Sequence, residues 1–176
     1  MANQRLTDKT ALEEQVGSGD LLMVVDVNDT TGSASGTSKK MDFKYLMQTD
    51  KISLSNAEAQ DLSTNEKVLV GALSGYMITV YNVTVLCTYA ASQETANKLL
   101  YLGFDDTENT RYWFAQPRFM NTITSNATYC FSPAPGLSGS YKESIINKPF
   151  IMWSSGAFNG GWSADVYVTY AYTKVL

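Results

Sequence analysis

The chain has 176 residues, a net charge of -4 and only 17% charged residues, which fits one folded domain plus an appended segment and argues against a basic nucleic-acid-binding face. No run approaches the roughly 20 apolar residues of a membrane span, and residues 1–5 lack the apolar core of an export signal. Eleven tyrosines and seven phenylalanines, with abundant Thr and Val, favour strands. We therefore expect a mostly β protein without membrane insertion.

The first predicted unit is built around an apolar run at residues 21–25. A Gly/Ser/Thr-rich excursion over 28–38 separates this run from residues 39–46, a pattern that predicts a strand, a mobile loop, a short strand and a short helix capped by Asp42. So small a unit cannot bury a run that is apolar on both faces, because domains below about 40 residues are rarely stable unaided. We therefore expect residues 1–48 to form an attachment module that docks through Leu21, Leu22, Val24, Val25, Phe43 and Leu46.

Residues 49–67 are polar and poor in aromatics, and they are predicted to be a linker. Within this stretch Ser55 and Glu58 have the spacing of a capping box, which predicts a short helix through Leu62.

Residues 68–176 carry a series of short strand-like runs with turn signals between them. Apolar and polar residues alternate with a period of two over 81–89 and again over 164–172, so one face of each long strand should lie on a core. Seven or eight strands at this spacing predict a C-terminal jelly-roll-like β-sandwich. The predicted strands are 68–70, 77–80 continuing directly into 81–89, 99–104, 111–114, 119–124, 128–131, 149–153 and 165–172.

The two cysteines, Cys87 and Cys130, lie in strand-like runs of a chain with no export signal. Since disulfides are rare in reducing compartments, we expect two reduced, buried thiols.

Catalytic chemistry has few candidates in this chain. It contains no histidine, which removes Ser-His-Asp and Cys-His nucleophiles and the commonest transition-metal ligand. Glycoside hydrolysis needs only two carboxylates, but three of the four acids considered crowd a turn-rich segment, where Asp and Asn usually serve backbone geometry. We expect no enzyme activity, cofactor or metal site, and the acids considered are Asp105, Asp106, Glu108 and Glu143.

Aromatic side chains offer a platform for a sugar ring. Trp113, Trp153 and Trp162, with Tyr112, are the candidates for it. Trp113 and Trp153, in predicted strands, are expected to make core or subunit contacts. Trp162 follows two glycines in a loop and is the tryptophan expected to be exposed, and hence to contact a glycan.

Two blocks frame the chain. The first is Leu6-Thr7-Asp8 followed by residues 19–25 and 37–46, and the second is residues 147–153, a Gly-rich loop and residues 166–170. Together they resemble the attachment module and the last two strands of small virion proteins of tailed bacteriophages, of the head-fibre, tail-fibre and decoration type. The resemblance implies a homotrimer whose amino-terminal part attaches to capsid, neck or tail proteins of the virion while its sandwich projects outward.

The main hypothesis is thus a structural protein of the virion, made in the cytoplasm of a host bacterium, as a trimeric head fibre or capsid-decorating fibre. One alternative is a tail-fibre or receptor-binding tip, a carbohydrate-binding module that contacts a host-surface glycan; it predicts exposed aromatics that converge on one groove. The other is a glycan-cleaving enzyme, which requires two acids in such a groove.

Overall fold

The computed structural model describes residues 21–42, 46–104, 112–132 and 145–175. The chain divides into two compact units, Met1–Leu46 and Met47–Leu176. The short helix predicted after Asp42 falls largely on residues 43–45, which lie outside the described residues.

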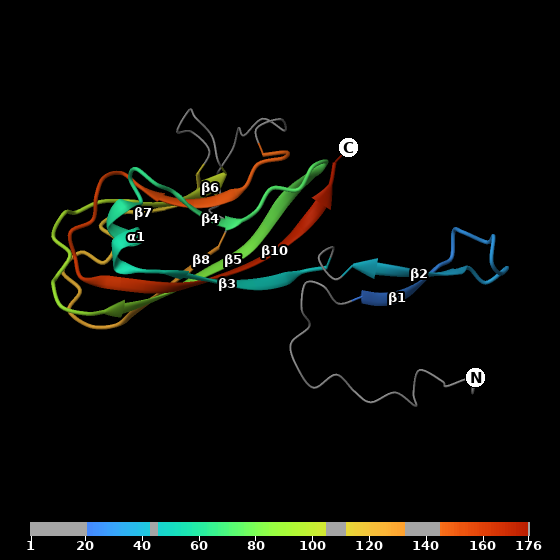
Figure 1. The fold of residues 1–176 in the computed structure, drawn as a ribbon, viewed down its shortest axis with the longest axis horizontal. Coiled ribbons are helices and arrows are strands. Elements are labelled where there is room, and N and C mark those ends of the chain that lie inside the picture. The colour runs from blue at the N-terminus through green and yellow to red at the C-terminus, as the bar shows by residue number, and fades with distance from the viewer. Residues whose placement is uncertain (1–20, 43–45, 105–111, 133–144, 176) are drawn as a thin grey trace. The chain divides into compact units, whose positions relative to one another are not determined.

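The first unit contains a two-stranded antiparallel ribbon (Figure 1). Its strands are β1 (Leu21–Asp26) and β2 (Thr37–Asp42), so the two strands predicted on either side of the loop are present. Asp42, predicted as a helix cap, is the last residue of β2.

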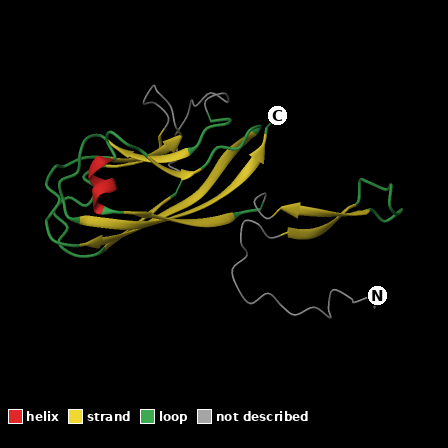
Figure 2. Cartoon of the chain, viewed as in Figure 1, coloured by secondary structure: helices red, strands yellow, loops and turns green. Residues whose placement is uncertain are grey.

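The second unit is a sandwich of two four-stranded antiparallel sheets (Figure 2). The chain alternates between the sheets in the manner of two Greek keys, which is the strand order of a jelly roll and confirms the predicted fold class. In spatial order, the first sheet is β3 (Gln48–Leu54), β10 (Trp162–Lys174), β5 (Tyr76–Tyr89) and β8 (Ala127–Phe131). The second sheet is β4 (Lys67–Val70), β9 (Phe150–Ser154), β6 (Leu100–Phe104) and β7 (Tyr112–Gln116).

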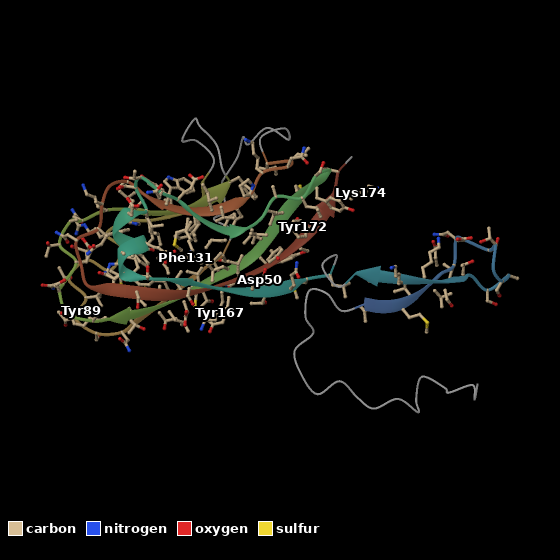
Figure 3. All side chains as sticks on the ribbon, viewed as in Figure 1. Asp50, Tyr89, Phe131, Tyr167, Tyr172 and Lys174 are labelled. Atoms are coloured by element: carbon tan, nitrogen blue, oxygen red, sulfur yellow. The ribbon has the colours of Figure 1, made fainter. Side chains whose placement is uncertain are left out.

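The core lies between these sheets, where side chains fill the space seen in Figure 3. Strict alternation along β10 supplies one wall, and buried residues of β9 and β6 supply the other. Each fully buried large side chain contributes roughly 1.5–3 kcal/mol to folding, so the core between the two sheets is the main source of stability. Among the residues that form it are Val166, Val168, Val83, Val85, Phe150, Met152, Leu100 and Leu102.

A β-bulge corrects the predicted alternation of the long strand β5. Thr169 of β10 pairs with Asn82 while the next residue, Tyr170, pairs with Val80, so Tyr81 is the extra residue. A bulge shifts the side-chain parity by one, which turns Tyr81 outward, 48% exposed, while Val83 stays in the core.

The polar stretch predicted to be a linker is part of the sandwich, which begins at Gln48. Residues 48–54 form edge strand β3, in which only Leu54 is fully buried, so the strand carries little apolar pattern to mark it. The predicted helix is confirmed as α1 (Asn56–Asp61), with Leu62 as its C-cap and a complete capping box between Ser55 and Glu58.

Residues 119–124, predicted as a strand, form turns instead. Arg118, Met120 and Thr122 all have positive φ values between 51° and 63°, a left-handed conformation that no strand can contain. Phe119 and Met120 nevertheless reach the core, which explains their strand-like apolar character.

Candidate functional site

The β1–β2 ribbon exposes apolar side chains on one of its faces. In an antiparallel pair opposite residues share a face, so Val25 lies on the face of its partner Ser38, and Met23 lies on the same face. Met23 is 70% exposed, Val25 is 56% exposed and Val27, just beyond β1, is 68% exposed. Lone apolar residues on a surface are ordinary, whereas three large ones from a single short segment mark an unpartnered surface.

A local polar network holds the loop at the end of the ribbon. Lys39 Nζ lies 2.9 Å from Asp26 and 2.8 Å from Asp29, and Asp29 also accepts hydrogen bonds from the backbone and hydroxyl of Thr31. The Lys39 ammonium, followed by Thr31, lowers the pKa of Asp29 to about 2. Gly36 has φ of 111°, and a side chain there would meet the Asp26 carbonyl at 2.8 Å. The loop predicted to be mobile therefore has an internal hydrogen-bonded structure.

The ribbon does not bring all the residues predicted to dock onto one surface. Leu22 and Val24 lie on one face and Val25 on the other, while Leu46, half-buried, lies beyond the ribbon. Phe43 and the side chain of Leu21 lie outside the described residues. Sequence reasoning overlooked Met23, which lies within the apolar run, and Val27, which lies just beyond it. The run was taken as buried on both faces, whereas Met23 and Val25 on one face are exposed, and so is Leu22 on the other.

Trp162, predicted to be exposed, is 1% exposed and lies in the core. The strand β10 begins at Trp162, two residues before the predicted alternation, so the indole falls on the inward face with Ala164. It packs edge-on against Phe119 and Phe158, with ring centroids 5.3 Å away in each case. The two glycines before it pack against residues 92–94, so the Gly-rich loop is a tight contact and Trp162 cannot serve as a glycan platform.

Trp153 is the described tryptophan that does stand on an outer face. Phe150 and Met152 of β9 point into the core, so Ile151 and Trp153 point outward from the second sheet. The Trp153 ring stacks on Tyr101 of β6, with centroids 5.3 Å apart and planes 29° apart. The side chains of Trp113 and Tyr112 lie outside the described residues.

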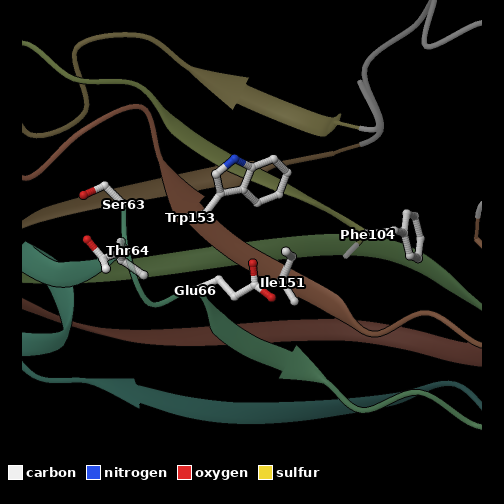
Figure 4. A pocket seen from close by; sticks show the side chains of 7 residues that line it. Ser63, Thr64, Glu66, Phe104, Ile151 and Trp153 are labelled. Carbon is white, nitrogen blue, oxygen red and sulfur yellow. The ribbon is translucent and has the colours of Figure 1, made fainter. Parts of the chain in front are cut away.

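A hollow of about 180 Å³ runs beside Trp153 on this face (Figure 4). Figure 4 shows the side chains of residues 63, 64 and 66, from the segment between α1 and β4, together with those of Ile151 and Trp153 from β9. Leu62 and Phe104 complete its lining.

No local pattern in the sequence pointed to Glu94, a carboxylate that is 1% exposed. Its Oε1 accepts a hydrogen bond from the Ala96 backbone at 2.7 Å, and its Oε2 accepts from the backbones of Asn159 and Gly160 at 2.8 and 2.7 Å. A side chain at Gly160 would meet the Glu94 backbone at 2.9 Å. Glu94 thus fastens the β5–β6 connection to the β9–β10 connection, which is a structural role.

The four acids considered for hydrolysis lie outside the described residues. Within the described ranges, no group of three or more Cys, Asp or Glu side chains is placed to hold a metal ion. No helix in the described part of the chain is long and apolar enough to span a membrane. Both cysteines are free, and Cys130 is exposed instead of buried as predicted, because it faces outward from β8 while Cys87 faces the core.

Comparison with known proteins gives structural neighbours only. No protein-family model and no curated protein matches the chain. A chain of the cyanophage Pam1 capsid asymmetric unit has a TM-score of 0.39 and 12% identity, covering 98% of this chain and 99% of that one. The PRD1 vertex protein P5 has a TM-score of 0.36 and 13% identity over 90% and 85% of the two chains. A capsid chain of an expanded equine rhinitis A virus particle, a picornavirus, has a TM-score of 0.27 and 10% identity over 99% and 87%. At these scores the likenesses carry no weight, and the jelly-roll assignment depends on the strand order.

Proposed function

We propose that this chain is a non-enzymatic structural protein of a bacteriophage particle, a trimeric head fibre or capsid-decorating fibre. In this proposal the β1–β2 unit docks on another virion protein and the jelly roll projects from the particle. The virion setting and the trimer come from the two sequence blocks described above. The observation that carries the docking role is the exposed apolar face of the ribbon, at Met23, Val25 and Val27.

The ribbon has a physical need for a partner. A two-stranded hairpin is at best marginally stable in water, and β1–β2 has no third strand among the described residues. Covering its apolar face would gain about 25 cal/mol for each Å² removed from water. Its outer strand edges also offer backbone groups to which a partner strand could pair. The jelly roll, by contrast, has its own core of buried residues.

The outer face of the first sheet is our candidate for the contact between subunits. Its residues are mostly hydroxyl-bearing, with paired hydroxyls of Thr49 and Thr169 2.9 Å apart and exposed Leu86 among them. On this face the charged residues of the described strands are Lys51 and Asp165, which pair with each other at 2.8 Å. Depletion of unpaired charge is typical of the centre of an interface, and a closed ring of three would bury the face without leaving an open end.

Removal of the ribbon unit tests the proposal. A chain that starts at Met47 should stay folded and keep the subunit number of the full chain, measured by light scattering on a sizing column, but should not join particles during assembly. In the full chain, Val25→Asp should likewise block incorporation, because it places a charge in the apolar contact. The matched control is Val68→Asp, which changes a residue of similar exposure on the sandwich. Normal incorporation of the truncated chain would refute docking through the ribbon, and a monomeric full chain would refute the trimer.

A further inference from the structure

The outer face of the second sheet carries a row of large apolar side chains across three strands. Val68 of β4 pairs with Ile151 of β9, and Tyr101 of β6 pairs with Trp153 of β9. Ile151 is only 3% exposed although it points away from the core, so its neighbours cover it. The solvent-facing side of an antiparallel sheet normally carries polar residues, so a row of apolar side chains there is unusual.

Trp153 is held in a defined orientation within the row. The strand order β4-β9-β6-β7 puts β6 on one side of β9 and β4 on the other. Tyr101, on β6, stacks on the indole, while the hollow extends toward the segment that leads into β4. The stack fixes the ring at the edge of the hollow before any ligand arrives, which lowers the entropic cost of binding.

The remaining wall of the hollow is polar. Ser63 and Thr64 carry hydroxyls that can donate and accept hydrogen bonds, and Glu66 carries a carboxylate that accepts them. All three side chains are exposed to solvent. Figure 4 shows their positions along the hollow. An apolar ring beside a short row of polar groups matches the two kinds of surface on a pyranose, which has an apolar C–H face and hydroxyls around its rim that donate and accept hydrogen bonds.

We propose that this hollow binds one ring of a neutral saccharide, with the ring stacked on Trp153 and its hydroxyls bonded to Ser63, Thr64 and Glu66. The volume of about 180 Å³ lies below that of pockets for drug-sized ligands and suits a single ring of a longer glycan. The Glu66 carboxylate, in a chain of net charge -4, disfavours uronic and sialic acids by like-charge repulsion. This site is on the jelly roll and does not depend on docking by the ribbon.

A protein partner is the competing occupant of the same row, and the hollow fits it less well. Stable protein interfaces bury about 800 Å² on each partner and exclude charge from their centre. Here Glu66 lies directly against the apolar row, within a small concave site. The sugar therefore fits both the size and the polarity of the hollow.

Titration of the full-length protein tests the proposal. The probes are cellobiose, maltose and N,N′-diacetylchitobiose, with glucuronic acid as the charged comparison, followed by tryptophan fluorescence and saturation-transfer NMR. We expect saturable binding of at least one neutral disaccharide and none of glucuronic acid. Trp153→Leu should weaken that binding at least tenfold, whereas Trp153→Phe, which keeps an aromatic face, should retain most of it. Glu66→Gln should change affinity several-fold and relax the rejection of glucuronic acid.

The matched control is Tyr81→Ala, which removes an exposed aromatic from the other sheet and should leave binding unchanged. Far-UV circular dichroism and the subunit number verify that each variant is folded and assembled. The proposal is overturned if no neutral disaccharide binds, if Trp153→Leu binds as the natural chain does, or if Trp153→Leu changes the subunit number, which would assign the row to a protein contact.

Discussion

The Glu94 carboxylate should contribute several kcal/mol to the free energy of unfolding, because it accepts three backbone hydrogen bonds in a buried setting. Glu94→Gln supplies one acceptor oxygen in place of two. If that oxygen replaces Oε2 and keeps the Asn159 and Gly160 bonds, the amide NH₂ faces the Ala96 N–H, and a buried donor loses its partner. An unsatisfied buried donor costs about 1–3 kcal/mol, and bonds to a charged acceptor are worth about 1.5–3 kcal/mol each. We therefore expect Glu94→Gln to lower the free energy of unfolding by about 3 kcal/mol, and Glu94→Ala by about 4 kcal/mol.

Urea unfolding of the full chain, followed by circular dichroism, measures this loss. With a slope of about 1–3 kcal/mol per M, a 3 kcal/mol change moves the midpoint by at least 1 M. Hydrogen exchange at the Ala96 amide should accelerate in parallel, since that amide loses its acceptor. Glu66→Gln makes the same chemical change at an exposed site, where an interaction with a charged group is worth at most about 1 kcal/mol, so its midpoint should move much less. A Glu94→Gln variant that unfolds at the natural midpoint would refute the role assigned to this carboxylate.

Three further predictions follow from the cores and ion pairs of the sandwich. In the native protein at pH 8 a thiol reagent should modify the exposed Cys130 but not Cys87, because burial raises the pKa of the Cys87 thiol to about 12. After denaturation both thiols should react. Equal reaction rates for the two thiols in the native protein would contradict this prediction. The ammonium of Lys67 lowers the pKa of Glu58 to about 2, below its usual 4.5. The stabilisation from the ionised Glu58 carboxylate is therefore complete above pH 4.5 and is lost as the pH falls toward 2. NMR of the Glu58 carboxyl carbon should follow this titration, and a midpoint near 4.5 would exclude the pairing with Lys67. Trp162→Ala should lower the free energy of unfolding by about 3–5 kcal/mol in a thermal melt, as for a buried core tryptophan, whereas an exposed platform would cost almost nothing.

Much of the fold could be predicted because local patterns record it. The alternation in β10 and the spacing of Ser55 and Glu58 are both short-range signals, and both gave the correct element. β3 was missed because an edge strand with one face in water needs little apolar pattern; its main partner is β10, more than a hundred residues later. The bulge at Tyr81 was missed for a related reason, since only the pairing register reveals it.

The candidate sites were harder to predict because they depend on which segments meet. Trp162 looked exposed from its glycine neighbours, yet those glycines are there to permit close packing against residues 92–94. Trp153 looked like a core residue because it lies in a strand. Its outward direction beside Tyr101 depends on which alternate residues of that strand face the core, and the sequence does not show this. Glu94 depends on loop amides more than sixty residues away, which no local spacing could indicate.

The pairing of β3 with β10 also bears on synthesis of the protein. The strand that opens the jelly roll hydrogen-bonds to the one that closes it, over seven residue pairs from Ala164↔Leu54 to Tyr170↔Gln48. On a ribosome β3 must wait, unpaired, until β10 has been synthesised and has left the exit tunnel. Contacts of such long sequence separation fold slowly, on the order of milliseconds to seconds. A message cut short within β10 would leave a nascent chain with an open sheet edge, and would make it a substrate for chaperones or for aggregation.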